Sequence, residues 1–264
     1  MKKRIDKEKI ISEVLPSLRG IELAVFDSIG STNDYAKGIA KSDREKSPLA
    51  VAAYEQTRGR GTRERSFISR GGAGVYMSIL FYPEEKITPA DITVYAAVAA
   101  SRAIEKVSML KCGIKWVNDV YVGGRKLAGI LTEGNMCDGA LQYAVVGIGI
   151  NTNAEVFPEE ICGIATSVKI ETQRSVTNEA LIAEMINSFF STLNTLGSRK
   201  VMDEYRARSV LIGKRIRVSS SKGEFEGRVA EICDTGAILI EKNDKTTVLL
   251  ESGDVSLNMT EESD

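Results

Sequence analysis

The stretch KWVNDVYVGGRKLAGILTE, residues 115–133, predicts a β-hairpin at the centre of a sheet. Gly123-Gly124 is a pair typical of a two-residue hairpin tip, and apolar runs lie on both sides of it. A strand over residues 113–117 would lead into the hairpin. Because alternate residues of a strand share a face, charge is expected to gather on one face of this segment. The two expected faces are Lys115, Val117 and Asp119 on one side, and Trp116 and Asn118 on the other.

Two lysines of this stretch, Lys115 and Lys126, are candidates for fixed positive charges. Lys126 follows the glycine turn and precedes the apolar Leu127, which would hold it at the sheet rather than at a free tip. A purely structural interpretation is also open, in which both lysines are cross-strand partners of Asp119 and Glu133.

A segment rich in arginine and glycine, QTRGRGTRER at residues 56–65, precedes the hairpin. Glycine lets backbone N–H groups turn inward as an anion nest, and arginine adds two-pronged donors for phosphate or carboxylate. With the two lysines, the segment would supply fixed cations and a mobile loop that closes over nucleotide phosphates. Its spacing is not that of a P-loop, and G-x-G-x-x-G does not occur, so a dinucleotide-binding fold has no support. The alternative is a solvated basic loop.

Composition limits the classes of function. The chain has 264 residues, 43% hydrophobic and 27% charged, which suits a globular protein with one large domain, or one large and one small. A net charge of −1 argues against a general nucleic-acid binder, so any phosphate site must be local. The chain has no histidine, which excludes Ser-His and Cys-His nucleophile pairs.

The four cysteines and the N-terminus bear on where the protein works. Cys112, Cys137, Cys162 and Cys233 are scattered, and without histidine they match no zinc set, so a reduced, cytoplasmic setting is expected. The first nine residues are charged and lead into no apolar run, so neither a signal peptide nor a membrane anchor is expected.

The pattern along the chain predicts an α+β fold in three parts. Residues 1–20 are expected to form a short helical segment, residues 21–210 a mixed sheet backed by helices, and residues 211–258 a small all-β barrel of short strands separated by turns. Ser31 and Thr88 have the spacing of helix caps. The expected strands of the large part are 23–26, 49–54, 75–82, 113–117 and 142–150, besides the hairpin. The expected helices start at Ser31 and Thr88 and cover residues 178–196 and 200–209.

The chain resembles the biotin protein ligases, because four sequence motifs occur in the same order as in that family. The matching residues are Ser31-Thr32-Asn33, the loop 56–65, the block Lys115–Asp119 with Arg125–Leu131, and Gly147-Ile148-Gly149-Ile150-Asn151. The resemblance implies a catalytic domain related to class II aminoacyl-tRNA synthetases, followed by an SH3-like barrel. It implies that biotin and ATP form biotinyl-5′-AMP, with Mg²⁺, and that biotin then passes to a lysine of a biotin carboxyl carrier domain.

The resemblance also implies roles for particular residues, with no metal ligands assigned. The implied catalytic residues are Lys126, Lys115 and Arg60. The implied biotin-binding residues are Ser31, Thr32, Asn33, Gln56, Gly59, Arg60, Gly61, Thr62, Lys126, Gly129 and Gly147, with the glycines Gly129 and Gly147 leaving room for the ligand. The implied ATP-binding residues are Arg63, Arg65, Lys115, Asn118, Asp119, Lys126 and Asn151.

The loop departs from the family pattern at two positions, where Thr62 replaces an arginine and Glu64 a glycine. The family's arginine contacts biotin and phosphate and helps to retain the adenylate, and threonine cannot donate a charged fork. Either Arg63 compensates from the next position, or the adenylate is held more weakly. Elsewhere Phe67 replaces a tryptophan and Val117 a proline, and Gly30 stands where aspartate is frequent.

Alternative functions remain open from the sequence. A lipoate–protein ligase or octanoyltransferase would share the catalytic fold, but those enzymes carry a histidine near an Arg-Arg-x-x-Gly-Gly-Gly segment, of which Arg70-Gly71-Gly72 is a partial echo. A biotin-responsive DNA regulator would need a helix-turn-helix, which twenty residues cannot build, so no DNA partner is expected. A phosphate-binding module without chemistry is the third alternative. Long sheet edges make a homodimer possible.

Overall fold

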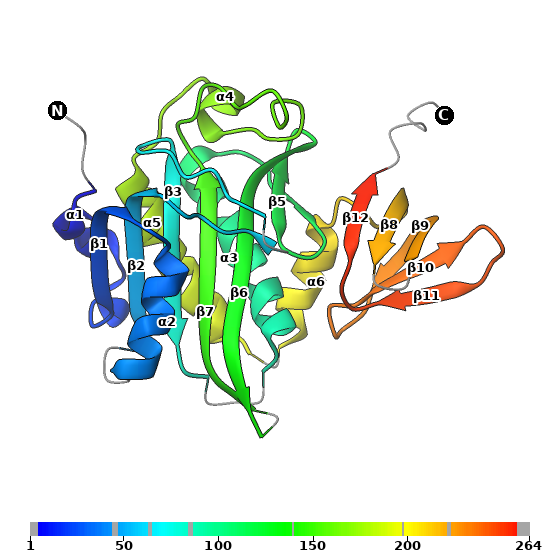
Figure 1. Cartoon of the computed structure of the whole chain (residues 1–264), viewed down its shortest axis with the longest axis horizontal. Coiled ribbons are helices and arrows are strands. Elements are labelled where there is room, and N and C mark those ends of the chain that lie inside the picture. Colours follow the sequence, from blue (N-terminus) through cyan, green and yellow to red (C-terminus); the bar gives the residue numbers. More distant parts are fainter. Residues whose placement is uncertain are drawn as a thin grey trace.

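The computed structural model describes residues 5–43, 47–62, 65–83, 87–138, 140–196, 198–220 and 223–257. It contains two sheets, with helices packed beside the first (Figure 1). The first sheet has the strand order β1-β2-β3-β7-β6-β5-β4. Its strands are β1 (Glu22–Ile29), β2 (Leu49–Gln56), β3 (Gly74–Phe81), β4 (Gly113–Lys115), β5 (Asp119–Val122), β6 (Arg125–Cys137) and β7 (Ala140–Asn151). β1 and β2 run parallel and the other neighbours antiparallel, so the expected mixed sheet is confirmed.

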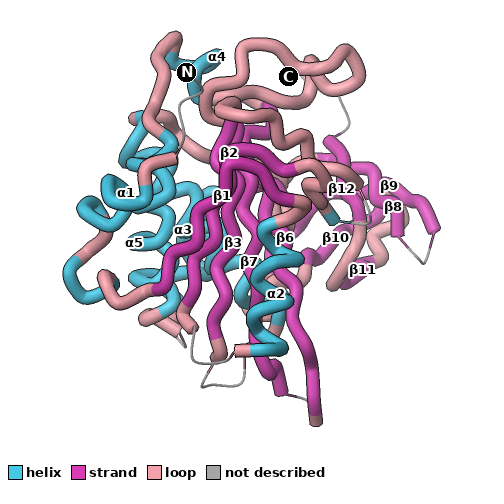
Figure 2. Tube along the Cα trace, turned by 60° about the vertical axis from the view of Figure 1, so that its left-hand side comes forward, coloured by secondary structure: helices cyan, strands magenta, loops and turns pink. Residues whose placement is uncertain are grey.

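Helices cover both faces of this sheet unequally (Figure 2). The helices are α1 (Lys7–Glu13), α2 (Thr32–Ser42), α3 (Pro89–Ser108), α4 (Val168–Thr172), α5 (Asn178–Leu193) and α6 (Arg199–Arg208), with a 3-10 turn at Pro16–Leu18. The larger core lies between the sheet and α3 and α5. Of the helices in the described ranges, α2 is the one on the other face, where it packs through Ala36 over Leu49, Val51 and Leu80. Part of that second face is therefore free to hold a site.

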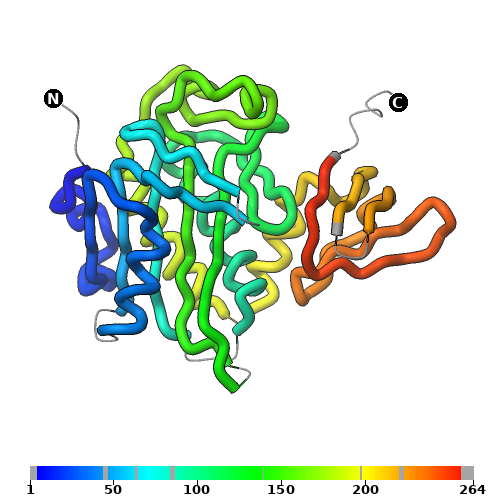
Figure 3. Tube along the Cα trace, viewed as in Figure 1, coloured from blue at the N-terminus to red at the C-terminus, as the bar shows by residue number. Residues whose placement is uncertain are grey.

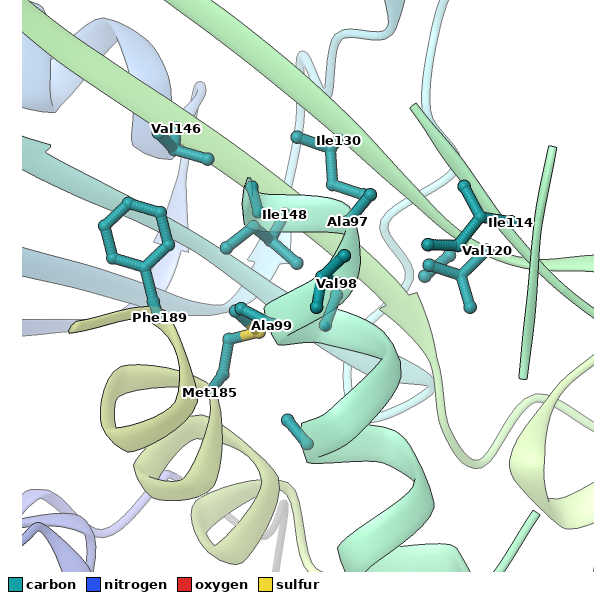
Figure 4. Close-up of a cluster of buried hydrophobic side chains, with 14 of the residues drawn as sticks. Ala97, Val98, Ala99, Ile114, Val120, Ile130, Val146, Ile148, Met185 and Phe189 are labelled. Carbon is teal, nitrogen blue, oxygen red and sulfur yellow. The ribbon is translucent and has the colours of Figure 1, made fainter. Parts of the chain in front are cut away.

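Helix α3 is the centre of the larger core, as its apolar circumference predicts. Thr88 caps it with a reciprocal bond to Asp91, and Pro89 occupies its first turn. Figure 4 shows part of this core, in which Ala97, Val98 and Ala99 of α3 lie near residues of the sheet and of α5. The sheet residues include Val146 and Ile148, and those of α5 are Met185 and Phe189. Small residues let α3 lie close to the strands, while each large side chain fully buried there contributes roughly 1.5–3 kcal/mol.

The second sheet is antiparallel, in the order β11-β10-β9-β8-β12. Its strands are β8 (Arg215–Ser220), β9 (Gly223–Ile232), β10 (Ile238–Lys242), β11 (Thr247–Leu250) and β12 (Asp254–Leu257). The indole N–H of the buried Trp116 donates to the carbonyl of Gly236, 2.7 Å away. Arg206 of α6 donates to the carbonyl of Ile232 at 2.7 Å. These bonds fasten the second sheet to the first part of the chain.

The expected strand over residues 113–117 was wrong in its second half. β4 ends at Lys115, the chain turns over residues 116–118, and β5 returns antiparallel, with Lys115 opposite Asp119. Asn118 fixes the turn, because its side chain donates to the carbonyl of Ile130 and its own carbonyl accepts from the Ile130 N–H, both at 2.8 Å. The segment thus forms two successive hairpins instead of one.

Candidate active site

An open cavity of about 500 Å³ lies on the sheet face that carries α2. The described parts of the segment between β2 and β3, residues 57–62 and 65–73, cross this face in front of β7 and β6 (Figures 1 and 3). They contribute Arg60, Gly61, Thr62 and Phe67 to the lining and are called the roof of the cavity. The floor is formed by β6, β7 and the start of α2. Of the residues implied for biotin or ATP, the cavity is lined by Ser31, Thr32, Asn33, Gln56, Arg60, Gly61, Thr62, Asn118, Lys126, Gly129 and Gly147.

The floor of the cavity lies close to the sheet backbone, because two neighbouring strands carry glycine, which has no side chain, at paired positions. Gly129 of β6 pairs with Gly149 of β7, and Gly147 lies between Ser78 and Leu131. Gly147 lines the cavity, and the expectation that it leaves room for a ligand stays a prediction. A Cβ at Gly147 would lie 2.3 Å from Oδ1 of Asn33, so this glycine makes room for Asn33.

The N-terminus of α2 is tied to the end of β2 by side-chain hydrogen bonds. Ser31 caps the helix by accepting from the N–H of Asp34. The N–H and hydroxyl of Thr32 both donate to Oε1 of Gln56, at 2.9 and 3.1 Å. Nε2 of Gln56 donates in turn to Ser69 at 3.0 Å. These bonds hold Thr32 and Gln56 in fixed orientations at the cavity wall.

Asn33 and Ser78 continue this network into the sheet. Oγ of Ser78 lies 2.7 Å from Oγ1 of Thr32 and 2.6 Å from Oδ1 of Asn33. Nδ2 of Asn33 donates to the carbonyl of Leu131 and to Oε2 of Glu133, at 3.3 and 2.7 Å. The amide hydrogens of Asn33 are therefore used within the protein, and Asn33 supports the floor.

Lys126 places its ammonium group in the cavity. Nζ is 2.6 Å from Oδ1 of Asp119. The backbone of Lys126 bonds to Ile164 and Thr166, which anchors the residue at the start of β6. The structural interpretation of the lysines is thus confirmed for the pair Lys126–Asp119 but not for Glu133, whose partners are elsewhere.

Lys115 is not among the residues that line this cavity. Its Nζ lies 3.4 Å from the hydroxyl of Tyr121 and 5.5 Å from the centre of that ring. Burial lowers the pKa of Lys115, with Asp119 opposing and Lys126 adding to the effect. Burial also raises the pKa of Tyr121 to about 12. Lys115 therefore lies outside the cavity lining, opposite Asp119 on the neighbouring strand.

The roof is itself a small hairpin. Phe67 N–H donates to Gly59 at 3.0 Å, and Gly61 N–H donates to Arg65 at 2.6 Å. Gly59 does not line the cavity. A Cβ at this position would lie 2.4 Å from the carbonyl oxygen of Phe67, so the two strands of this hairpin can approach each other only if residue 59 is glycine. Arg63 and Glu64 lie outside the described residues. Compensation by Arg63 thus stays a prediction.

The two described arginines of the roof that were implied for phosphate are both paired with carboxylates. Arg60 lies 2.7 Å from Glu133 and 2.8 Å from Asp34. Arg65 points away from the cavity lining and pairs with Asp254 of β12. Burial alone would raise the pKa of Glu133, but its hydrogen bonds from Lys37 and Asn33 and the charge of Arg60 hold that pKa below its usual range.

Asn151 lies apart from the lining of the Lys126 cavity. Its Nδ2 donates to the carbonyl of Thr166 at 3.0 Å, and the residue lines a second, larger cavity of about 2200 Å³. That cavity is bounded by α1, the β2–β3 segment and the start of α5. Sequence reasoning could not separate Asn151 from Gly147, since both lie on one strand.

Sequence reasoning missed the apolar wall and the supporting carboxylate. The wall consists of Phe67, Met77, Ile130, Leu131 and Ile148. Phe67 was noted only as a replacement, and its ring fills the space above Gly149, where a Cβ would lie 2.6 Å from it. Glu133 was considered only as a partner of the lysines. Strand alternation could have placed Leu131 and Glu133 on the face of Gly129, but not the α2 residues that meet them.

Two negative findings apply to the described parts of the chain. In those ranges no group of three or more histidine, cysteine or acidic side chains is placed to hold a metal ion. Among the helices described, none combines the length and apolar character needed to cross a bilayer.

Comparison with known protein families gives two matches. Residues 25–151 match the biotin/lipoate A/B protein ligase family, and residues 211–258 match the biotin protein ligase C-terminal domain. The chain is 30% identical to the bifunctional ligase/repressor BirA of Bacillus subtilis, over 91% of this chain and 76% of that protein. It is also 30% identical to the biotin–[acetyl-CoA-carboxylase] ligase of Mycobacterium tuberculosis, over 89% of this chain and 88% of that protein.

Solved structures show the same fold. The biotin protein ligase of Aquifex aeolicus, in complex with biotin and ATP, superimposes with a TM-score of 0.78 at 24% identity, covering 90% of this chain and 98% of that one. The biotin protein ligase of Leishmania major, in complex with biotinyl-5-AMP, gives 0.63 at 21% identity, covering 88% and 99%. These likenesses confirm the expected fold, a mixed sheet backed by helices with an SH3-like C-terminal domain.

Proposed function

Because the chain belongs to the biotin/lipoate A/B protein ligase family, with biotin ligases among its relatives, we propose that it is a biotin protein ligase. It activates biotin with ATP and then transfers biotin to a lysine of a biotin carboxyl carrier domain, in the cytoplasm. The observation that carries this proposal is one cavity that holds both Lys126 and Arg60 beside a wall of neutral hydrogen-bonding groups.

The first step joins two anions, so the site must reduce their repulsion and align them. A carboxylate oxygen of biotin attacks the α-phosphorus of ATP, and pyrophosphate leaves. We infer that the ammonium group of Lys126, which lines the cavity, contacts both the carboxylate and the α-phosphate. Asp119 holds this group through their 2.6 Å contact until the substrates arrive. Lys115 adds positive charge from behind Asp119.

The second step transfers the biotinyl group. The amine of the carrier lysine attacks the carbonyl of the mixed anhydride, the C–O bond to phosphate breaks, and AMP leaves while the amine loses a proton. The cavity is open to solvent, which gives an amine a route to the adenylate.

The neutral part of the cavity suits the ureido ring of biotin. That ring has one carbonyl and two N–H groups, which would cost free energy if buried without partners. Ser31, Thr32 and Gln56 lie at the wall as hydroxyl and amide groups, and the apolar residues Phe67 and Ile148 can cover the rest of the ligand. Asn118 reaches the cavity from the β4–β5 turn and is proposed to contact the nucleotide.

Magnesium fits this site only as part of the nucleotide complex. Among the described residues Asp119 is a carboxylate close to Lys126, and no larger acidic group surrounds it. Mg²⁺ characteristically keeps waters and binds through phosphates with one or two carboxylates. The ion would accompany ATP and neutralise its phosphates.

The direct test supplies the purified protein with biotin, ATP, Mg²⁺ and a biotin carboxyl carrier domain. The expected result is a mass gain of one biotinyl group on one carrier lysine, together with pyrophosphate release that needs biotin. Lipoate in place of biotin is the matched control, because the related lipoate ligases share the fold. Transfer of lipoate but not biotin would contradict the proposal.

A further inference from the structure

Glu133 lies where the floor and the roof of the cavity meet. It belongs to β6, and its side chain is 23% exposed. Oε2 accepts from Nδ2 of Asn33 and from the guanidinium of Arg60, each at 2.7 Å. Oε1 accepts from Nζ of Lys37 at 2.9 Å. One carboxylate thus connects the strand, the helix α2 and the roof.

We propose that Glu133 is a positioning residue for biotin binding, which joins the polar floor through Asn33 to the roof through Arg60. The proposal rests on the proposed function, because it assigns Glu133 a part in that reaction. It also changes the expected role of Arg60, which anchors the roof to the floor instead of waiting as a free phosphate ligand.

The floor depends on Glu133 because Asn33 has few alternatives. Asn33 is 4% exposed, and its amide group accepts from Ser78 and donates to Leu131 and Glu133. The bond to Leu131 is long at 3.3 Å, so the charged acceptor is the stronger partner. Without it, Asn33 can rotate, and Ser78 and Thr32 lose their fixed arrangement.

Glu133 is also connected to the roof, through its ion pair with Arg60. The guanidinium of Arg60 is held between Glu133 and Asp34, and Lys37 balances the charge of the two carboxylates. Asp34 is 45% exposed, so its share of the attraction is more strongly screened by water than that of Glu133. Glu133 is thus the firmer of the two anchors.

The experiment uses the full-length protein and three variants, Glu133→Gln, Arg60→Gln and the double variant. Glutamine keeps an oxygen for Asn33 but removes the charge that holds Arg60. Glu184→Gln is the matched control, because Glu184 forms a comparable 2.7 Å pair with Lys106 on the helical side of the sheet. Two quantities are measured: amide hydrogen exchange across residues 57–69 without ligands, and the KM for biotin in pyrophosphate release.

In Glu133→Gln, exchange at Gly61 and Phe67 is expected to rise at least about fivefold, and the KM for biotin about tenfold, as for loss of a charged hydrogen bond. The kcat should change less than the KM. The double variant should be no worse than the worse single variant, because both act through one contact. Glu184→Gln should change neither quantity.

Exchange and KM both within about twofold of wild type in Glu133→Gln would overturn the proposal, as would additive effects in the double variant. If Glu133→Gln does not fold, Arg60→Gln tests the same contact from the other side, and the same two thresholds apply. If the wild-type protein releases no pyrophosphate with biotin, the proposed function fails. The exchange of the ligand-free protein still decides whether Glu133 holds the roof.

Discussion

The floor and the roof of the cavity are held by different kinds of contact. On the floor, Thr32, Asn33 and Ser78 are buried and joined by side-chain hydrogen bonds. In the roof, the side chains of Arg60 and Arg65 are 38% and 65% exposed and bind carboxylates. Buried bonds keep a fixed geometry, whereas exposed ion pairs are weak and are screened by salt. The molecule thus combines a rigid floor with a more easily released roof.

The largest expected effect comes from removing the ammonium group of Lys126, which lies between the floor and the roof. Lys126→Ala should lower the rate of biotin-dependent pyrophosphate release about 10²–10³-fold, as removal of one charge-stabilising donor does elsewhere. Lys106→Ala, a surface change on α3, is the control. A rate within tenfold of wild type would remove Lys126 from the chemistry and leave the cavity a binding site only.

The next effect tests the rigidity of the floor. A Cβ at Gly147 would lie 2.3 Å from Oδ1 of Asn33, so Gly147→Ala should displace Asn33. Overpacking of this kind costs about 1–3 kcal/mol, and we expect a rise of about thirtyfold in the KM for biotin. Gly38→Ala on α2 is the control, since a Cβ there meets nothing within 4 Å. An unchanged KM would show that the floor adapts.

A smaller effect concerns how long the roof retains the intermediate. Threonine at position 62 lines the cavity without a charge, so the adenylate should leave early and label unrelated lysines. Thr62→Arg adds a charged donor and should lengthen retention about tenfold in a filter-binding assay. Thr62→Val controls for the loss of the hydroxyl. Equal retention in wild type and Thr62→Arg would refute weak retention.

The smallest effect tests the exposed end of the roof. Asp254→Asn removes the partner of Arg65, and both side chains are largely solvated. The free energy of unfolding in urea should change by less than about 1 kcal/mol. A loss above about 2 kcal/mol would mean that the contact between the roof and the second sheet is as firm as the floor.

The sequence predicted most elements because their signals are local. Thr88-Pro89 and Ser31 mark helix starts by capping chemistry, and the short strands after residue 211 follow turn residues. The turn after Lys115 was missed because the strand-like alternation of residues 113–117 masks it. Its cause, the bonding of Asn118 to Ile130, joins residues that are distant along the chain.

Site residues that belong to a sequence motif could be predicted, whereas those brought together by strand pairing could not. Ser31, Gln56, Arg60 and Lys126 were named from the sequence and lie around one cavity. The contacts of Glu133 and Ser78 could not be predicted, because they depend on which strands are neighbours and in which register. The pairing of Arg60 with Asp34 and Glu133 could not be predicted either, because it requires the roof, α2 and β6 to lie together.

The position of Trp116 has a practical consequence. It is the single tryptophan of the chain, it is 4% exposed, and its indole is bonded to Gly236 at the contact between the two sheets. Its intrinsic fluorescence is therefore an unlabelled optical reporter of that contact. Any separation of the sheets during turnover would admit water and shift the emission to longer wavelength, so stopped-flow fluorimetry can follow the motion directly.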